Sequence, residues 1–118
     1  MAPRAIQRGV RQSARKVRLV VDLIRGKNVN EAYAVLKFAK QRAAKQIQKV
    51  LKSAVSNAEQ DAIRANTAFD VDQLYVSFAA VNEGATLKRF HAAAMGRATP
   101  LHKRTSAVEI RVAAKEAK

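Results

Sequence analysis

The stretch that most constrains this fold is residues 82–104, which has no apolar face of its own and lies between two segments patterned like β-strands. Apolar side chains recur at every second position on both sides of it: Leu74, Val76, Phe78 and Ala80 before, and Val108, Ile110 and Val112 after. This period of two predicts two half-buried strands joined as a hairpin. The connection is too long for a tight turn, so we expect both strands to continue into solvent and to turn near residues 91–96. At about 3.3 Å per residue, each arm from Leu74 to the turn would be about 50–60 Å long.

The projecting part of the predicted hairpin is basic. Its one carboxylate is Glu83, and its cations are Lys88, Arg89, Arg97, Lys103 and Arg104. A two-stranded hairpin without a core is only marginally stable in water, so a partner outside the chain is expected to complete it. A disordered basic insertion is the alternative, but the strand pattern on both flanks favours the hairpin. Gly84 and Gly96 stand where a bulge or a turn would need glycine, and Pro100 fits an edge position.

The charge of the whole chain indicates the class of partner. A formal net charge of +14 on 118 residues destabilises a lone compact state by self-repulsion. A polyanion would neutralise this charge, and nucleic acid is the usual one. Cysteine is absent, which excludes disulfides, thiolate metal sites and cysteine nucleophiles. No secretory signal and no apolar run of about eighteen residues is visible, so we expect no membrane contact and a cytosolic or organelle-matrix setting.

The N-terminal residues 2–11 predict a short edge strand without a clean apolar face. Arg4 and Arg8 have the same parity as Ile6 and Val10, so charged and apolar side chains would share one face. Arginines at a sheet edge discourage pairing with other strands. Arg4, Arg8 and Arg11 therefore either protect the edge or contact phosphates.

A first helix is predicted after Ser13, whose hydroxyl is expected to accept hydrogen bonds from the first-turn amides. Its apolar stripe has helical spacing and consists of Val17, Val20, Val21 and Ile24. Gly26 is expected to end this helix. The opposite face carries Arg15, Arg18 and Arg25, and the excess charge of the chain favours a partner for this face over solvent alone.

Two further helices follow in the sequence. Asn30 is expected to cap the second, whose apolar stripe is Ala32, Val35, Leu36 and Ala39. The third is predicted from Arg42 to about Arg64, with one apolar face formed by Ile47, Val50, Leu51, Ala54, Val55 and Ala58. We expect solvent around its second basic stripe, which consists of Arg42, Lys45, Lys49 and Lys52. Residues 66–73 are expected to form a loop, and the end after Val112 is expected to fray.

These elements together predict an α+β fold. Three helices are expected to pack on a small antiparallel sheet, from which the long β-hairpin projects. No linker and no internal repeat divides the chain, so residues 1–118 are expected to form a single domain.

The sequence lacks the patterns of catalytic and metal sites. His91 and His102 lie in the basic ribbon without a neighbouring carboxylate, and further metal ligands are not apparent. There is no glycine-rich phosphate loop and no G-x-S-x-G motif. We therefore expect no enzyme activity, no cofactor and no metal.

Two kinds of nucleic-acid-binding protein then remain. A DNA-binding helical module would use the turn between helices at residues 26–30, but this alternative leaves the hairpin without a role. The aromatic content of 5% disfavours a platform for base stacking. Arginines and lysines spread over several elements are better suited to following the phosphates of a folded RNA.

Four segments are specific enough to suggest a family: SARKVRLVVDLIRGK, AAKQIQKVLKSAVSNAE, LYVSFAAVNEGATLKRF and AMGRATPLHKRTSAVEI. In this order they resemble the twenty-second protein family of the large ribosomal subunit, in its bacterial form. The resemblance implies an α/β body beside the exit of the nascent polypeptide and a hairpin that lines the exit tunnel. It further implies binding to large-subunit ribosomal RNA next to neighbouring ribosomal proteins, a role in early subunit assembly, and no enzyme activity.

The charge pattern and the resemblance together predict the site residues. The predicted RNA contacts are Arg4, Arg8, Arg11, Arg15, Lys16, Arg18, Arg25, Lys88, Arg89, Arg97, Lys103 and Arg104. The resemblance also implies contacts from Gly96 and Thr105. The predicted tunnel-facing tip consists of His91, Ala92, Ala93, Ala94, Met95 and Gly96. The family commonly has arginine, proline and arginine where this chain has residues 91–93, so the tip is expected to be less cationic.

Overall fold

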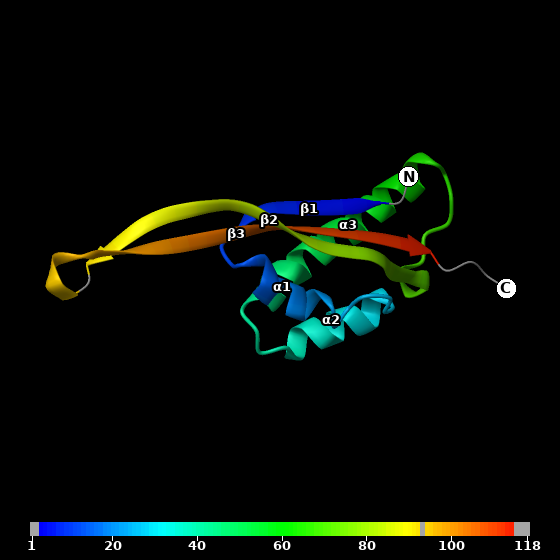
Figure 1. The fold of residues 1–118 in the computed structure, drawn as a ribbon. Helices are drawn as coiled ribbons and strands as arrows, with labels where there is room; N and C mark the ends of the chain where they lie inside the picture. Colours follow the sequence, from blue (N-terminus) through cyan, green and yellow to red (C-terminus); the bar gives the residue numbers. More distant parts are fainter. Residues whose placement is uncertain (1–2, 93, 115–118) are drawn as a thin grey trace.

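The computed structural model describes residues 3–92 and 94–114 and confirms the α+β fold (Figure 1). The strands are β1 (Arg4–Val10), β2 (Leu74–Ala92) and β3 (Ala98–Ala114). The helices are α1 (Ala14–Val21), α2 (Val29–Phe38) and α3 (Ala43–Arg64), with two short 3-10 turns, η1 (Val71–Gln73) and η2 (Ala94–Gly96). None of the helices within these described residues is long and apolar enough to cross a membrane.

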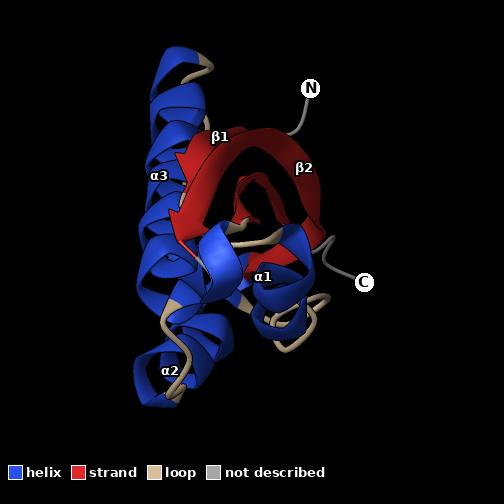
Figure 2. Cartoon of the chain, turned by 60° about the vertical axis from the view of Figure 1, so that its left-hand side comes forward, coloured by secondary structure: helices blue, strands red, loops and turns tan. Residues whose placement is uncertain are grey.

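The three strands form one antiparallel sheet in the order β1-β3-β2, and the helices gather on one side of it (Figures 1 and 2). Helix α3 packs against β1 and β3, α1 packs against β2, and α2 packs on α3. The β2–β3 pairing runs from Leu74 opposite Ala114 to Ala92 opposite Ala98. Beyond Val81 the hairpin leaves the core and projects, which gives the molecule extents of 68 × 27 × 18 Å. The predicted hairpin is therefore confirmed.

The predicted buried face of β2 is correct only at its beginning. Leu74 and Val76 are buried, but the register with β3 then shifts before Phe78, and the next buried residues are Ala79 and Val81. An irregularity that adds one residue to a strand moves the following side chains to the opposite face. Phe78 consequently lies on the open face of the sheet, and the prediction that it faces the core was wrong.

A similar one-residue irregularity explains why the amino-acid sequence of β1 shows no apolar face. Its register with β3 shifts between Gln7 and Val10, and Gly9 within this interval has a φ of 72°. Positive φ is a conformation that glycine adopts without steric cost. Ala5 and Val10 are both buried despite their odd spacing, because the shift turns Val10 towards the helices.

The helix ends differ from the predicted ones in three places. Ser13 is the N-cap residue of α1, but its hydroxyl makes no capping hydrogen bond. Asn28, not Asn30, caps α2, since its side-chain oxygen accepts from the Asn30 amide at 2.9 Å. Helix α1 ends at Val21, and the chain reaches Gly26, with a φ of 73°, through tighter turns.

The predicted loop and tail also require correction. Residues 66–73 contain the short η1, in which the Asp70 carboxylate accepts from the Asp72 amide at 3.0 Å. Ala113 and Ala114 belong to β3 and pair with Tyr75 and Leu74, so the strand extends past the predicted end at Val112. The remaining predicted tail residues, 115–118, lie outside the described residues.

One polar group is buried in the core without a hydrogen-bond partner among the described residues. Ser106 is fully buried beside the apolar core residues of β3, and its hydroxyl has no partner. A buried polar group that loses water without gaining a hydrogen bond is destabilising.

We predict that Ser106→Ala leaves the free energy of unfolding unchanged or raises it by about 1 kcal/mol, because the unsatisfied hydroxyl is removed. Urea unfolding of the free protein measures this effect. Ser77→Ala is the matched control, since the Ser77 hydroxyl donates to the Arg111 carbonyl at 3.2 Å. The control is expected to lose about 0.5–1 kcal/mol. A larger loss for the Ser106 variant than for the control would contradict the prediction.

Candidate nucleic-acid interface

Both faces of the projecting hairpin carry cations. We define the stem as residues 86–91 of β2 and 99–104 of β3. Directly paired residues of an antiparallel ladder share a face. One face carries the pairs Arg89–Leu101 and Leu87–Lys103, and the other carries Thr86–Arg104, Lys88–His102 and Phe90–Pro100. Within the described residues, no cation of the stem forms an ion pair with a carboxylate, so the stem offers positive charge in both directions.

The edge of β3 is open along the stem. Strand β1 stops at Val10, opposite Ser106, and from residue 105 towards the tip β3 pairs only with β2 within the described residues. The chain turns away from the sheet at Arg11 and Gln12 to begin α1. An open strand edge presents backbone N–H and C=O groups that no neighbouring strand uses.

A groove of about 960 Å³ lies between this edge and the helices. We call it the stem groove; it is built from the end of β1, the start of α1, the connection from α2 to α3, and β3. Its cationic and imidazole side chains are Arg11, Lys16, Arg42, His102, Lys103 and Arg104. None of its lining residues is a carboxylate. A concave surface with cations from four segments concentrates positive potential and suits a phosphate backbone.

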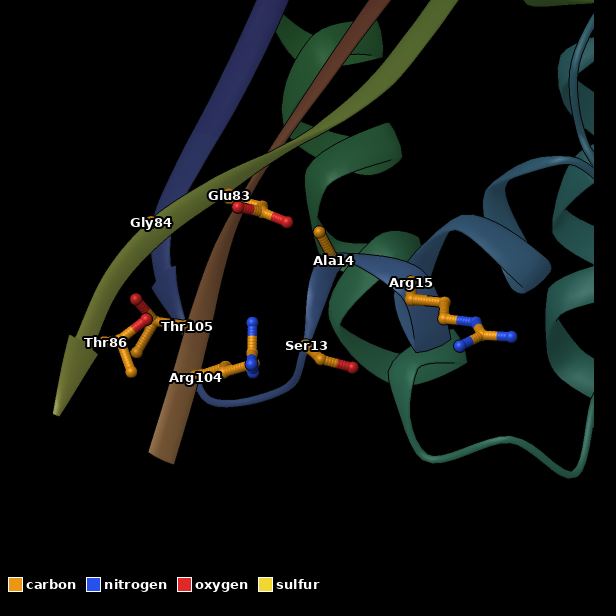
Figure 3. A pocket seen from close by; sticks show the side chains of 8 residues that line it. All are labelled: Ser13, Ala14, Arg15, Glu83, Gly84, Thr86, Arg104 and Thr105. Carbon is orange, nitrogen blue, oxygen red and sulfur yellow. The ribbon is translucent and has the colours of Figure 1, made fainter. Parts of the chain in front are cut away.

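A smaller hollow of about 380 Å³ shares Ser13 and Arg104 with the stem groove. Figure 3 shows Arg104 directed into this hollow and Arg15 directed away from it. The Glu83 side chain is directed towards Ala14 on the same side (Figure 3). Because this carboxylate repels phosphate, the stem groove is the better candidate for an RNA strand.

The wall of this hollow depends on a close approach of the two hairpin strands at Gly84. The register shifts between Glu83 and Thr86, and the Thr105 hydroxyl donates to the Ala85 carbonyl at 2.6 Å. A Cβ atom on Gly84 would lie 2.7 Å from Thr105 Oγ1 and 3.3 Å from its backbone. The bulge predicted at this glycine is therefore present, and the approach requires a residue without a side chain.

Three of the arginines predicted to contact RNA form hydrogen bonds or ion pairs with other residues of this chain. The Arg18 guanidinium donates to the Val81 carbonyl from Nε at 3.1 Å and from Nη2 at 2.9 Å. Arg25 forms an ion pair with Asp22 at 3.4 Å, and Arg4 forms one with Glu109 at 3.4 Å. Arg18 thus fastens α1 to the last buried residue of β2, at the root of the hairpin.

The other predicted residues fall into two groups. Arg11, Lys16, Lys103 and Arg104 meet in the stem groove, whereas Arg8, Arg15, Lys88, Arg89 and Arg97 are exposed outside it. The tip residues other than Ala93, which lies outside the described residues, are all exposed, and Met95 is 96% exposed. Contacts from any of these residues to RNA or peptide stay predictions.

Sequence reasoning missed two residues of the stem groove. Gln41 and Arg42 precede α3 and line the groove, although we expected Arg42 to belong to a solvent-facing stripe. Helical periodicity cannot identify them, because the groove forms only when this connection is brought beside β3 and α1. The residues 3–92 and 94–114 hold no group of three or more side chains able to bind a metal.

The alternative of a DNA-binding helical module fits the structure poorly. Helix α2 would be the recognition helix, with side chains near its N-terminus directed at base edges. Instead, the side-chain amide of Asn30 donates to the Asp72 carboxylate at 2.6 Å, and the side-chain amide of Asn28 donates to the Asp72 backbone carbonyl at 2.8 Å. Glu31 adds a negative charge at the same end. The two asparagine side chains are thus occupied by Asp72, and the carboxylates of Asp72 and Glu31 would repel DNA phosphates at this end of the helix.

The fold and the groove define a basic nucleic-acid-binding protein with a small body and a projecting hairpin. Residues 5–113 match the family described as Ribosomal protein L22p/L17e, and the chain belongs to this family, whose members are structural proteins and not enzymes. The chain is 54% identical to the Large ribosomal subunit protein uL22 of Ligilactobacillus salivarius, over 95% of this chain and 93% of the relative. It is 53% identical to uL22 of Clostridium novyi, over 93% and 95%, and 50% identical to uL22 of Oceanobacillus iheyensis, over 98% of both.

We predict that Gly84→Ala lowers the free energy of unfolding by about 1–3 kcal/mol, because the added methyl displaces the Thr105 hydroxyl and strains the root of the hairpin. A double-mutant cycle with Thr105→Ala tests the cause, since this change removes the nearest atom. The double variant should lose less than the two single variants together. Additive losses in urea unfolding would show that the contact with Thr105 is not responsible.

Proposed function

We propose that this chain is a structural constituent of the large ribosomal subunit that binds ribosomal RNA through the stem groove and both faces of the stem. The observation that carries this proposal is the convergence of five cations from four segments on one groove without a carboxylate. Each cation can neutralise a phosphate and release its counterion, which favours binding without reading the base sequence.

The two parts of the molecule would then act differently in the assembled subunit. The body is held together by its own core, whereas the stem has cations on both faces and no core behind it. An RNA segment on each face would neutralise the stem and replace the missing partner. The protein would in this way fix the relative positions of RNA segments that approach from opposite sides.

The tip is suited to a different contact. Residues 91, 92, 94 and 95 include no lysine, arginine or carboxylate, and the Met95 side chain is freely exposed. A neutral, partly apolar tip gives phosphates little to bind. We assign the tip to the wall of the exit tunnel, where it would face the nascent polypeptide in transit. Neighbouring ribosomal proteins would contact the body, and the place of action is the cytoplasmic ribosome.

Arg42 gives a sharp test of the stem groove. With about eight phosphates neutralised, a plot of log K against log salt for binding to large-subunit ribosomal RNA should have a slope of about −6 to −7. Arg42→Gln should weaken binding and make the slope smaller in magnitude by about 0.7–0.9, the effect of one lost phosphate contact. Filter binding across a salt series measures both quantities.

The matched control for this experiment is Lys52→Gln. Lys52 is exposed on α3, the helix that follows Arg42, and does not line the groove, so the total charge falls equally while the groove stays intact. Equal effects of the two variants would mean that net charge, and not the groove, determines binding. A slope near zero for the unchanged protein would defeat the electrostatic account altogether.

Stem and tip are predicted to have separable effects on incorporation into the subunit. Replacing residues 93–97 by Asn-Gly closes the strands after the Ala92–Ala98 pair with a favourable two-residue turn and removes only one cation, Arg97. Incorporation should remain near the unchanged level. Neutralising Lys88, Arg89, Lys103 and Arg104 together should reduce it severely, because several phosphate contacts are lost.

Quantitative mass spectrometry of purified subunits gives the ratio of variant to tagged unchanged chain in cells that express both. This ratio should be higher for the tip replacement than for the stem variant. The reverse order would mean that the tip, and not the stem, anchors the protein.

A further inference from the structure

The segment that closes the body at the end away from the hairpin tip has a net charge opposite to that of the whole molecule. Residues 59–74, from the last part of α3 to the first residue of β2, contain four carboxylates and one cation, a net charge of −3 in a chain of +14. The carboxylates are Glu59, Asp61, Asp70 and Asp72, and the cation is Arg64. Phosphates are repelled from such a surface, so this end is poorly suited to RNA.

A groove of about 510 Å³ opens at this acidic end, at the right in Figure 1. We call it the end groove. Its apolar lining includes Ala58, Ala62, Phe69, Leu74, Val112 and Ala113. Asp61 and Asp70 also line it, and none of the lining residues in the described part of the chain is a cation. The end groove therefore combines an apolar surface with negative charge.

Both carboxylates are available for a cation from outside. Within residues 3–92 and 94–114, neither Asp61 nor Asp70 forms an ion pair. Asp70 accepts a hydrogen bond from the Asp72 amide, which leaves further acceptor positions on its two oxygens. Among residues 3–92 and 94–114, no lysine or arginine lines this groove, although the chain is strongly basic.

We propose that the end groove binds a lysine- or arginine-bearing segment of another protein in the assembled particle. The aliphatic part of such a side chain would lie on Ala62 and Phe69, while its charged end would reach Asp61 or Asp70. This inference rests on the proposed function, because it requires a neighbouring protein within the subunit. RNA is the competing occupant, and the charge of the groove argues against it.

A photoreactive amino acid at Thr67 tests the proposal in the intact particle. Thr67 is exposed and lines the end groove. Irradiation of purified large subunits, followed by nuclease and protease digestion and mass spectrometry, identifies what is attached. We expect a peptide of another protein with lysine or arginine next to the crosslinked position. Absence of a product, or a nucleotide adduct, in subunits that contain the chain would overturn this inference while leaving the proposed function intact.

Charge variants establish whether the acidic side chains select the occupant. The double variant Asp61→Asn/Asp70→Asn should lower the crosslink yield by about threefold to thirtyfold, the effect of losing two exposed ion pairs. Asparagine at position 70 can still cap η1, so the fold is preserved. Glu31→Gln is the control, since Glu31 is exposed on α2 and does not line the groove. Equal yields from all three proteins would overturn the proposal.

The experiment must distinguish an external partner from the last four residues of this chain as the occupant of the end groove. They follow Ala114, which itself lines the end groove, and they include Lys115 and Lys118. A variant that ends at Ala114 should give the same crosslinked peptide in the same yield. A crosslink to residues 115–118 of this chain, or loss of the product in the shortened variant, would overturn the proposal of an external partner.

Discussion

The β2–β3 ladder continues far beyond the hydrophobic core, and the rest of the structure depends on how the root of this ladder is held. Backbone hydrogen bonds join β2 to β3 from the Leu74–Ala114 pair to the Ala92–Ala98 pair, but they do not fix the direction of the hairpin relative to the body. Direction is set where the last core residues lie. There the Arg18 guanidinium holds the Val81 carbonyl, and the glycine at position 84 lets β2 approach Thr105. A few contacts at the root thus set the direction of a stem that, among the described residues, contains no buried side chain farther out.

The open sheet face shows why a partner is needed only beyond this root. Within the body, Glu109 accepts from both Arg4 and Arg111, and the Arg111 guanidinium lies 4.6 Å from the centre of the Phe78 ring. Side chains on this face therefore satisfy one another. The same two strands continue into the stem, but there each cation is opposite a neutral residue. The change from paired to unpaired charge occurs where the core ends.

The sequence predicted the elements well and the faces of the strands less well, for a physical reason. A strand or helix that buries one side has apolar residues with a period of two or of 3.6, so the hairpin and the three helices could be predicted. A bulge moves the following side chains to the opposite face of the strand, and the residue types in the strand do not reveal it. Glycine marks the bulge at position 84 and the turn of register at Gly9, but no glycine marks the shift before Phe78. The choice of Asn28 over Asn30 as a cap was equally hidden, because it depends on Asp72 from a distant segment.

The stem groove was the least predictable feature because no single segment contains it. Its cations could be counted from the sequence, but Arg42 joins Lys16 and Lys103 only through the way α3, α1 and β3 pack. The early end of β1 is equally necessary, since one more paired strand would cover the edge of β3 along the stem. The position where β1 stops thus decides whether the edge of β3 along the stem is exposed. Under the proposed function, charge would give this surface its affinity for phosphate, and the early end of β1 would give phosphate access to it.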